Sequence, residues 1–192
     1  MQIAISSHTG MDVEPRVSGD VAGRLREGDR AAFAGVYQAN HAAVFRFALN
    51  MTGDRAKAAE LTQDVFVWLI HHAGNFDPTR GEMGAFLIGV ARKLLQRQQR
   101  DARRWLPLID AILRRPEPRV DPARGIDLDR LRKAIALLPV RYREAVVLCD
   151  LEDRSYEEAA ELIGCAVGTI RSRLHRGREL LMRKLQPAKE RV

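Results

Sequence analysis

The sequence lacks the features that mark secreted, membrane-spanning or metal-binding proteins. Its two cysteines, Cys149 and Cys165, are too few for a disulfide framework, and no CxxC or His-rich metal spacing occurs. There is no run of about 18 apolar residues, and the N-terminus has no basic segment followed by an apolar one. We therefore expect a cytoplasmic protein without a bound metal, whose cysteines are small buried residues in a reducing compartment.

Catalytic motifs are also absent. None of the patterns GxxxxGK[ST], GxGxxG, HExxH and GxSxG occurs in the chain. Carboxylates are plentiful, but none is isolated in an apolar setting of the kind that perturbs catalytic acids and bases. We predict that the chain is not an enzyme and uses no cofactor.

Positive charge is abundant and unevenly placed. The 192 residues carry a formal net charge of +7, which favours a polyanionic partner. Residues 20–76 hold six Lys/Arg and six Asp/Glu, residues 77–104 hold seven against three, and residues 164–192 hold eight against two. The local charges are thus 6 − 6 = 0, 7 − 3 = +4 and 8 − 2 = +6. Two separate basic blocks predict two separate contacts with nucleic acid.

The apolar pattern predicts an all-α fold of two small domains. Apolar residues recur at helical spacing in successive segments, and no strand-like alternation or internal repeat is present. Prolines at 107, 116, 118 and 122 interrupt the pattern and indicate a Pro-rich linker. We expect the following division: a flexible tail (1–19), a helical domain (20–104), the linker (105–127) and a second helical domain (128–187).

Within the first domain, helices are predicted from Asp29 to about Thr52, from Arg55 to about His72 and from Met83 to about Arg104. The third of these has the sharpest division into an apolar and a basic half. The loop before it, Gly74 to Gly81, contains Phe76, which we expect to be exposed. The basic half suits phosphate and base contacts better than solubility alone, and it comprises Arg92, Lys93, Gln96, Arg97, Gln99 and Arg100.

Near the C-terminus, residues 155–178 have the pattern of a helix-turn-helix. Ser155 and Glu158 form a capping box for a first helix, and Gly164 ends it. A second helix carries one narrow apolar stripe, and its remaining surface is basic and rich in hydrogen-bonding groups, which is typical of a helix that enters a major groove. The alternative is an ordinary helical hairpin with a solvated basic face. The candidate DNA contacts are Thr169, Arg171, Ser172, Arg173, His175 and Arg176.

Taken together, these segments resemble the sigma-70 family of RNA polymerase sigma factors, in its two-domain extracytoplasmic-function (ECF) group. The stretch LLPVRYREAVVLCDLEDRSYEEAAELIGCAVGTIRSRLHRGRELL resembles the family's region 4. The stretch VYQANHAAVFRFALNMTGDRAKAAELTQDVFVWLI resembles the first half of region 2, and FDPTRGEMGAFLIGVARKLLQRQQR resembles the segment that melts and reads the promoter. The chain departs from the family at Phe86 and Lys93, where Trp and Asn are common.

The resemblance implies a role for each segment. The helix from Thr169 would read the duplex −35 element, and the Pro-rich linker would thread the polymerase between the two domains. The core polymerase would dock on Leu61, Gln63, Asp64 and Phe66. The melted −10 strand, with one base flipped out, would contact Asn75, Phe76, Asp77, Arg80, Arg92, Lys93, Gln96, Arg97 and Arg100. An anti-sigma factor is a further expected partner.

Two other functions remain open from the sequence. A stand-alone helix-turn-helix regulator would bind duplex DNA tightly without polymerase, usually as a dimer. A non-DNA interaction module would use the basic faces to bind RNA or an acidic protein. Neither alternative gives the first domain and the second domain the joint role that the resemblance implies.

Overall fold

The computed structural model describes residues 20–110 and 128–185, and every regular element in these ranges is helical. The predicted tail (1–19), most of the linker (111–127) and residues 186–187 lie outside the described residues. The all-α prediction is confirmed. No helix within 20–110 and 128–185 is both long enough and apolar enough to cross a membrane.

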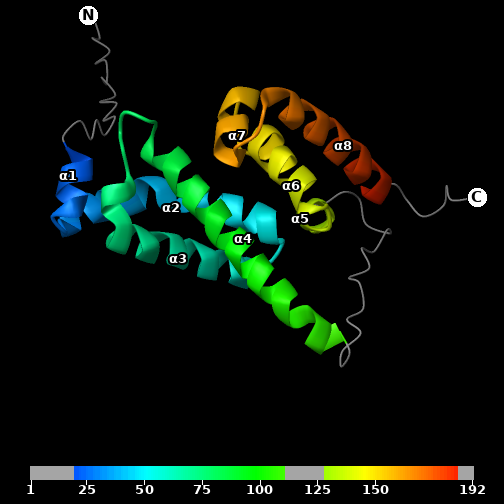
Figure 1. The fold of residues 1–192 in the computed structure, drawn as a ribbon, viewed down its shortest axis with the longest axis horizontal. Helices are drawn as coiled ribbons and strands as arrows, with labels where there is room; N and C mark the ends of the chain where they lie inside the picture. The colour runs from blue at the N-terminus through cyan, green and yellow to red at the C-terminus, as the bar shows by residue number, and fades with distance from the viewer. Residues whose placement is uncertain (1–19, 111–127, 186–192) are drawn as a thin grey trace, which may run out of the picture.

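The first unit consists of five helical elements. They are α1 (Val21–Arg26), α2 (Arg30–Thr52), α3 (Arg55–His72), the short 3-10 helix η1 (Ala73–Asn75) and α4 (Met83–Asp110). In Figure 1, α4 crosses the molecule diagonally in front of α2, and the end of α2 emerges beside the second unit. The loop from Phe76 to Glu82 leads from η1 into α4.

The ends of α2 and α3 follow from local chemistry. The Asp29 carboxylate accepts hydrogen bonds from the backbone N–H groups of Ala31 and Ala32, at 2.8 and 3.2 Å. Asp54 caps α3 in the same manner. Between the helices, Gly53 adopts φ +68°, a left-handed conformation that favours glycine and ends α2. The predicted bounds of both helices are confirmed.

The second unit contains α5 (Leu128–Ala136), α6 (Val140–Val146), α7 (Tyr156–Ile163) and α8 (Val167–Leu185). A π-helical turn, η2 (Val147–Leu151), continues α6. Gly164, with φ +75°, closes α7 and begins the turn into α8. The helix-turn-helix prediction is therefore confirmed as α7 and α8.

The structure corrects three sequence-based expectations. Phe76 was expected to be exposed, but it is buried (6% exposed), because its ring packs on Phe86 with centroids 5.3 Å apart. Leu128 is exposed, although its helical spacing with Leu131 and Ile135 predicts that it lies on the apolar face of α5. Helix α4 continues past Arg104 to Asp110. A single proline, Pro107, removes one backbone donor and disfavours a helix locally, but the helix-forming residues on both sides outweigh that effect.

The two units share one apolar core. Phe47 and Met51 of α2 belong to the same cluster of buried side chains as Ile135 of α5 and Val147 and Leu148 of η2. Helix α2 packs on α5, and α4 packs on α7. The −10-reading helix predicted from the sequence therefore lies against the helix-turn-helix unit.

Candidate nucleic-acid interface

Helix α8 is fixed in the second unit by its apolar stripe. Ile170 and Leu174 are fully buried, and Gly177 lies so close to α6 that an added Cβ would be 2.7 Å from a methyl carbon of Val146. The Ser155 hydroxyl accepts a hydrogen bond from the Glu158 N–H at 3.1 Å, and the Glu158 carboxylate accepts one from the Ser155 N–H at 2.8 Å. This capping box sets where α7 begins and so how α8 is presented.

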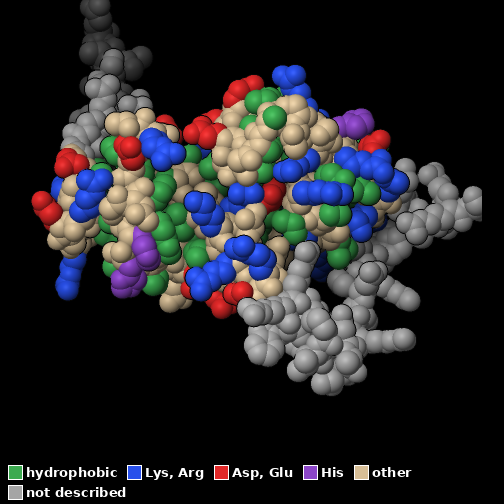
Figure 2. All heavy atoms as spheres, viewed as in Figure 1, with side chains coloured by type: hydrophobic (Ala, Val, Ile, Leu, Met, Phe, Trp, Pro, Cys, Tyr) green, Lys and Arg blue, Asp and Glu red, His purple; other side chains and the backbone are tan. Residues whose placement is uncertain are grey.

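The outer surface of α8 carries most of the predicted duplex contacts. Arg171, Ser172, His175 and Arg176 are exposed, and Thr169 and Arg173 are half-buried at its edges. The Arg171 guanidinium lies 5.8 Å from the ring centroid of Tyr156, which links α8 to the first residue of α7 through a cation–π contact. Figure 2 shows Lys and Arg side chains on this side of the molecule over both α4 and α8.

One acidic residue lies within this basic surface. The Glu179 carboxylate accepts a hydrogen bond from Arg176 Nη1 at 2.7 Å and lies 3.5 Å from His175. The hydrogen bond from Arg176, reinforced by the positive charges around it, lowers the pKa of Glu179. Glu179 thus holds the Arg176 side chain in place, and its spacing of three residues from Arg176 was the signal in the sequence.

The loop before α4 and the first turns of α4 surround a cavity of about 710 Å³. Asn75, Asp77 and Arg80 are exposed in the loop, and the buried Phe76 ring lines the cavity with Phe86. Asp77 accepts hydrogen bonds from the Thr79 hydroxyl (2.7 Å) and N–H (2.9 Å), and these bonds lower its pKa. The cavity has apolar walls and charged groups at its rim, as a pocket for an unstacked base requires.

The predicted basic face of α4 is divided by the structure. Lys93, Arg97 and Arg100 are exposed, and Arg97 Nε lies 3.9 Å from the Asp101 carboxylate one turn further along α4. Arg92 and Gln96 instead point into the junction between the units, where Arg92 Nε donates to the Glu144 carboxylate at 2.8 Å and Gln96 Nε2 donates at 3.0 Å. This pairing could not be predicted from the spacing of residues along α4, because Glu144 is 52 residues from Arg92.

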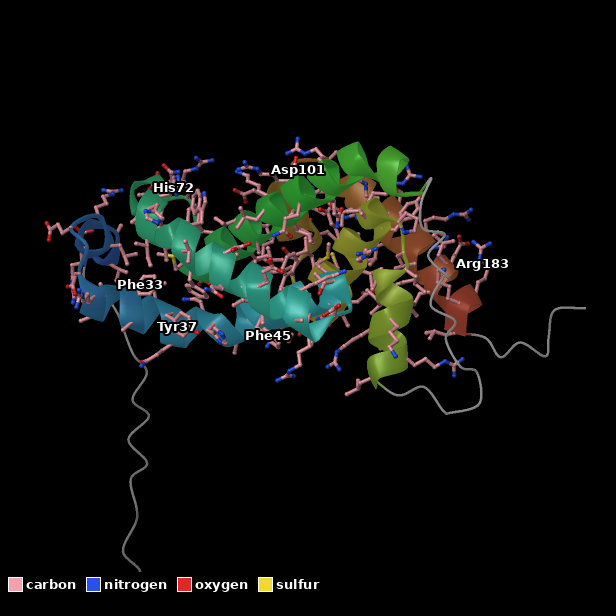
Figure 3. All side chains as sticks on the ribbon, turned by 90° about the horizontal axis from the view of Figure 1, so that it is seen from below. Phe33, Tyr37, Phe45, His72, Asp101 and Arg183 are labelled. Atoms are coloured by element: carbon pink, nitrogen blue, oxygen red, sulfur yellow. The ribbon has the colours of Figure 1, made fainter. Side chains whose placement is uncertain are left out.

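The predicted polymerase contacts also separate into two groups. Gln63 is exposed and Asp64 is half-buried, whereas Leu61 is 1% exposed and belongs to the core. Phe66 is buried but lines a groove of about 760 Å³ between α2 and α3. Figure 3 labels three aromatic residues along α2 that line the same groove, namely Phe33, Tyr37 and Phe45.

This groove was not predicted from the sequence, although Val67 and Ile70 offered a signal. Both are large apolar residues of α3 outside its core stripe, and both are exposed at the groove. Tyr37 is also exposed there, although its spacing placed it with the core residues of α2. No cluster of three or more metal-ligating side chains is found within the described ranges.

Family models match both units in this order. The model for Sigma-70 region 2 matches residues 36–105, and the model for Sigma-70, region 4, matches residues 128–181. The chain belongs to the sigma-70 family of RNA polymerase sigma factors. Relatives named as ECF RNA polymerase sigma factors include SigE and SigC, and this chain is an ECF sigma factor.

Three similarities define the relationship further. The chain is 34% identical to ECF RNA polymerase sigma factor SigE of Mycolicibacterium smegmatis over 145 residues, which cover 72% of this chain and 55% of that protein. It is 33% identical to SigC of Mycobacterium tuberculosis over 165 residues, covering 84% of this chain and 87% of that one. Among solved structures, RpoE in complex with the anti-sigma factor NepR from Bartonella quintana matches with a TM-score of 0.67 and 28% identity, covering 80% of this chain and 96% of that one.

Proposed function

We propose that this ECF sigma factor is a non-catalytic, cytoplasmic initiation subunit that gives core RNA polymerase its promoter specificity. The main observation that supports this proposal is a pair of basic surfaces, one on each unit. The first lies on α4 and its preceding loop, in the region 2 match, and the second lies on α8, in the region 4 match. We assign residues 20–104 to the −10 and polymerase functions and residues 128–187 to the −35 function.

We propose that α8 reads the −35 duplex. Its exposed arginines suit guanine edges, which accept two hydrogen bonds from one guanidinium in the major groove. Arg176 is the strongest candidate for such a contact because Glu179 already holds its guanidinium at 2.7 Å. Arg171, stacked toward Tyr156, is the second candidate, and Thr169, Ser172, Arg173 and His175 complete the contact surface.

We propose that the loop and α4 take the melted −10 strand. The cavity beside Phe76 and Phe86 supports insertion of a flipped base, which needs aromatic or apolar walls. The exposed Lys93, Arg97 and Arg100 would follow the strand backbone, because single-stranded DNA binds along cationic tracks. Asn75, Asp77 and Arg80 would contact the strand at the rim of the cavity.

We propose that the core polymerase docks on α3 through Gln63 and Asp64, with the groove beside Phe66 taking an apolar side chain of the polymerase. Leu61 would support this surface from the core. The solved RpoE structure holds an anti-sigma factor, NepR, and from this similarity we infer that an anti-sigma factor also binds this chain.

The decisive test is transcription by core polymerase with and without the protein, on promoters located by mapping transcription starts after overexpression. Arg176→Ala should weaken promoter binding by about 1–3 kcal/mol, which corresponds to about a 5- to 150-fold loss of transcription from that promoter. The loss should occur only on promoters that carry the −35 base that Arg176 reads. Arg183→Ala is a matched control, because Arg183 is an exposed arginine two turns further along α8. Failure to stimulate any promoter would overturn the proposal, and tight duplex binding without polymerase would favour a stand-alone regulator.

A further inference from the structure

A buried carboxylate joins the two units at the centre of their junction. Glu144 of α6 is 3% exposed and accepts hydrogen bonds from two side chains of α4, Arg92 and Gln96. The Arg92 guanidinium also donates to the Leu162 carbonyl of α7 at 3.2 Å. The Arg92 side chain is only 14% exposed, so this basic residue is covered by the second unit rather than by solvent.

Two further sets of contacts cross the junction away from α4. The Glu152 carboxylate accepts hydrogen bonds from Arg46 at 2.9 Å and from Asn50 at 3.4 Å, both on α2. Arg143 Nη1 donates to the Met51 carbonyl at 2.6 Å. Because buried charges are stable only when they are paired, these contacts favour one defined placement of the units.

The second unit also forms one wall of the cavity that we assign to the flipped −10 base. Arg154, Glu158, Glu161 and Leu162, from α7 and the turn before it, line the cavity with Lys93 of α4. Arg154 Nη1 lies 3.4 Å from the Glu158 carboxylate and balances its charge, so Glu161 is the α7 carboxylate that would repel the phosphates of a nucleic-acid strand.

We propose that this arrangement is a closed state in which the helix-turn-helix unit occupies the −10-binding face, with the Glu144 carboxylate bound to Arg92 and Gln96 in place of the promoter strand. This inference rests on the proposed function and adds to its −10 surface Arg92 and Gln96, which the resemblance to the family implies as strand contacts. Glu144 and the promoter strand would exclude each other from this face, because the Arg92 guanidinium and the Gln96 amide cannot donate the same hydrogen bonds to Glu144 and to a nucleotide at once. The protein must open before it binds the −10 strand.

Opening has a measurable effect on affinity. When only a fraction of the molecules is open, the apparent dissociation constant rises by the inverse of that fraction. If about one molecule in ten is open, disrupting the closed state should tighten binding of single-stranded DNA by about tenfold. Glu144→Lys is suited to this purpose, because it places an ammonium opposite Arg92 in the closed state and in solvent in the open state.

The test uses the full chain and two readouts. Small-angle X-ray scattering reports the radius of gyration, and fluorescence anisotropy reports binding of a fluorescein-labelled random-sequence single-stranded DNA. Glu157→Lys is the matched control, because Glu157 is exposed on α7, does not line the cavity and undergoes the same change in charge. Circular dichroism verifies that each variant remains helical, and Glu152→Lys, which disrupts the contacts to α2 instead, replaces Glu144→Lys if that variant does not fold.

We expect the wild-type protein and Glu157→Lys to scatter as compact particles and Glu144→Lys to have a larger radius of gyration. We also expect Glu144→Lys to bind the DNA about tenfold more tightly than Glu157→Lys does. Superimposable scattering of Glu144→Lys and wild type, or an extended wild-type protein, would overturn the closed state. If Glu144→Lys opens but binds the DNA no more tightly than Glu157→Lys, then Glu144 does not compete with the strand, and Arg92 and Gln96 are not part of the −10 surface. Scattering involves no polymerase or promoter, so failure of the proposed function in transcription would be seen separately.

Discussion

Gly177 should be a position at which a normally stabilising substitution destabilises the protein. An alanine in a helix interior is favoured over glycine by about 1 kcal/mol. At Gly177, however, the new Cβ would be 2.7 Å from Val146 Cγ2 and 3.2 Å from the Tyr142 carbonyl oxygen. Overpacking of this kind costs about 1–3 kcal/mol, and the Tyr142 contact is with backbone, which cannot move independently of α6. The net effect of Gly177→Ala should be a loss of about 1 kcal/mol in the free energy of unfolding.

Gly168→Ala provides the comparison, because Gly168 lies in the same helix and an added Cβ there would meet no atom within 4 Å. That variant should gain about 0.4–1 kcal/mol, chiefly by restricting the unfolded chain. Urea denaturation followed by circular dichroism measures both changes, with the wild-type protein as the reference. Equal stability of Gly177→Ala and Gly168→Ala would refute this prediction, because it would show that α8 does not pack closely against the backbone of α6 at Gly177.

Two other predictions concern the capping box and a cysteine. Ser155→Ala should cost about 1 kcal/mol of stability in thermal denaturation at pH 7. The hydrogen bonds from Ser155 lower the pKa of Glu158 below its ordinary 4.5, so the stability that the ionised Glu158 contributes is present above about pH 4.5 and is lost as the pH falls through the folded-state pKa. Glu158→Gln should remove this loss of stability in acid. If the variant and the wild type lose stability equally in acid, Glu158 is not the group responsible. Burial raises the pKa of the Cys149 thiol. In a Cys165→Ser variant, iodoacetamide should therefore modify Cys149 more slowly than it modifies free cysteine at pH 8. Equal rates would show that the Cys149 thiol is accessible and would contradict this prediction.

The features that the sequence predicted well are those set by neighbouring residues. Asp29, Asp54 and Ser155 cap helices within three positions of themselves, and Gly164 ends a helix through its own backbone conformation. The apolar stripe of α8 likewise follows from spacing along one helix. Local chemistry of this kind is visible in any sequence and does not depend on the tertiary fold.

The features that the sequence did not predict depend on contacts between distant segments. Phe76 has the loop position of an exposed aromatic, yet Phe86 covers it. Arg92 and Gln96 have the spacing of a solvent-facing helix surface, but α6 supplies Glu144 to bind both. Periodicity shows which side of a helix is polar, and it does not show whether water or another polar element lies against that side.

The shared apolar core of the two units has a consequence for temperature. Ile135, Val147 and Leu148 lie in one buried cluster with Phe47 and Met51, so separating the units would expose apolar surface to water. Exposure of apolar groups to water raises the heat capacity, and the stabilisation that their burial provides therefore weakens on cooling. The balance between a closed and an open molecule would therefore shift with temperature, and cooling would weaken the apolar part of the closed junction while the buried ion pair of Glu144 remained.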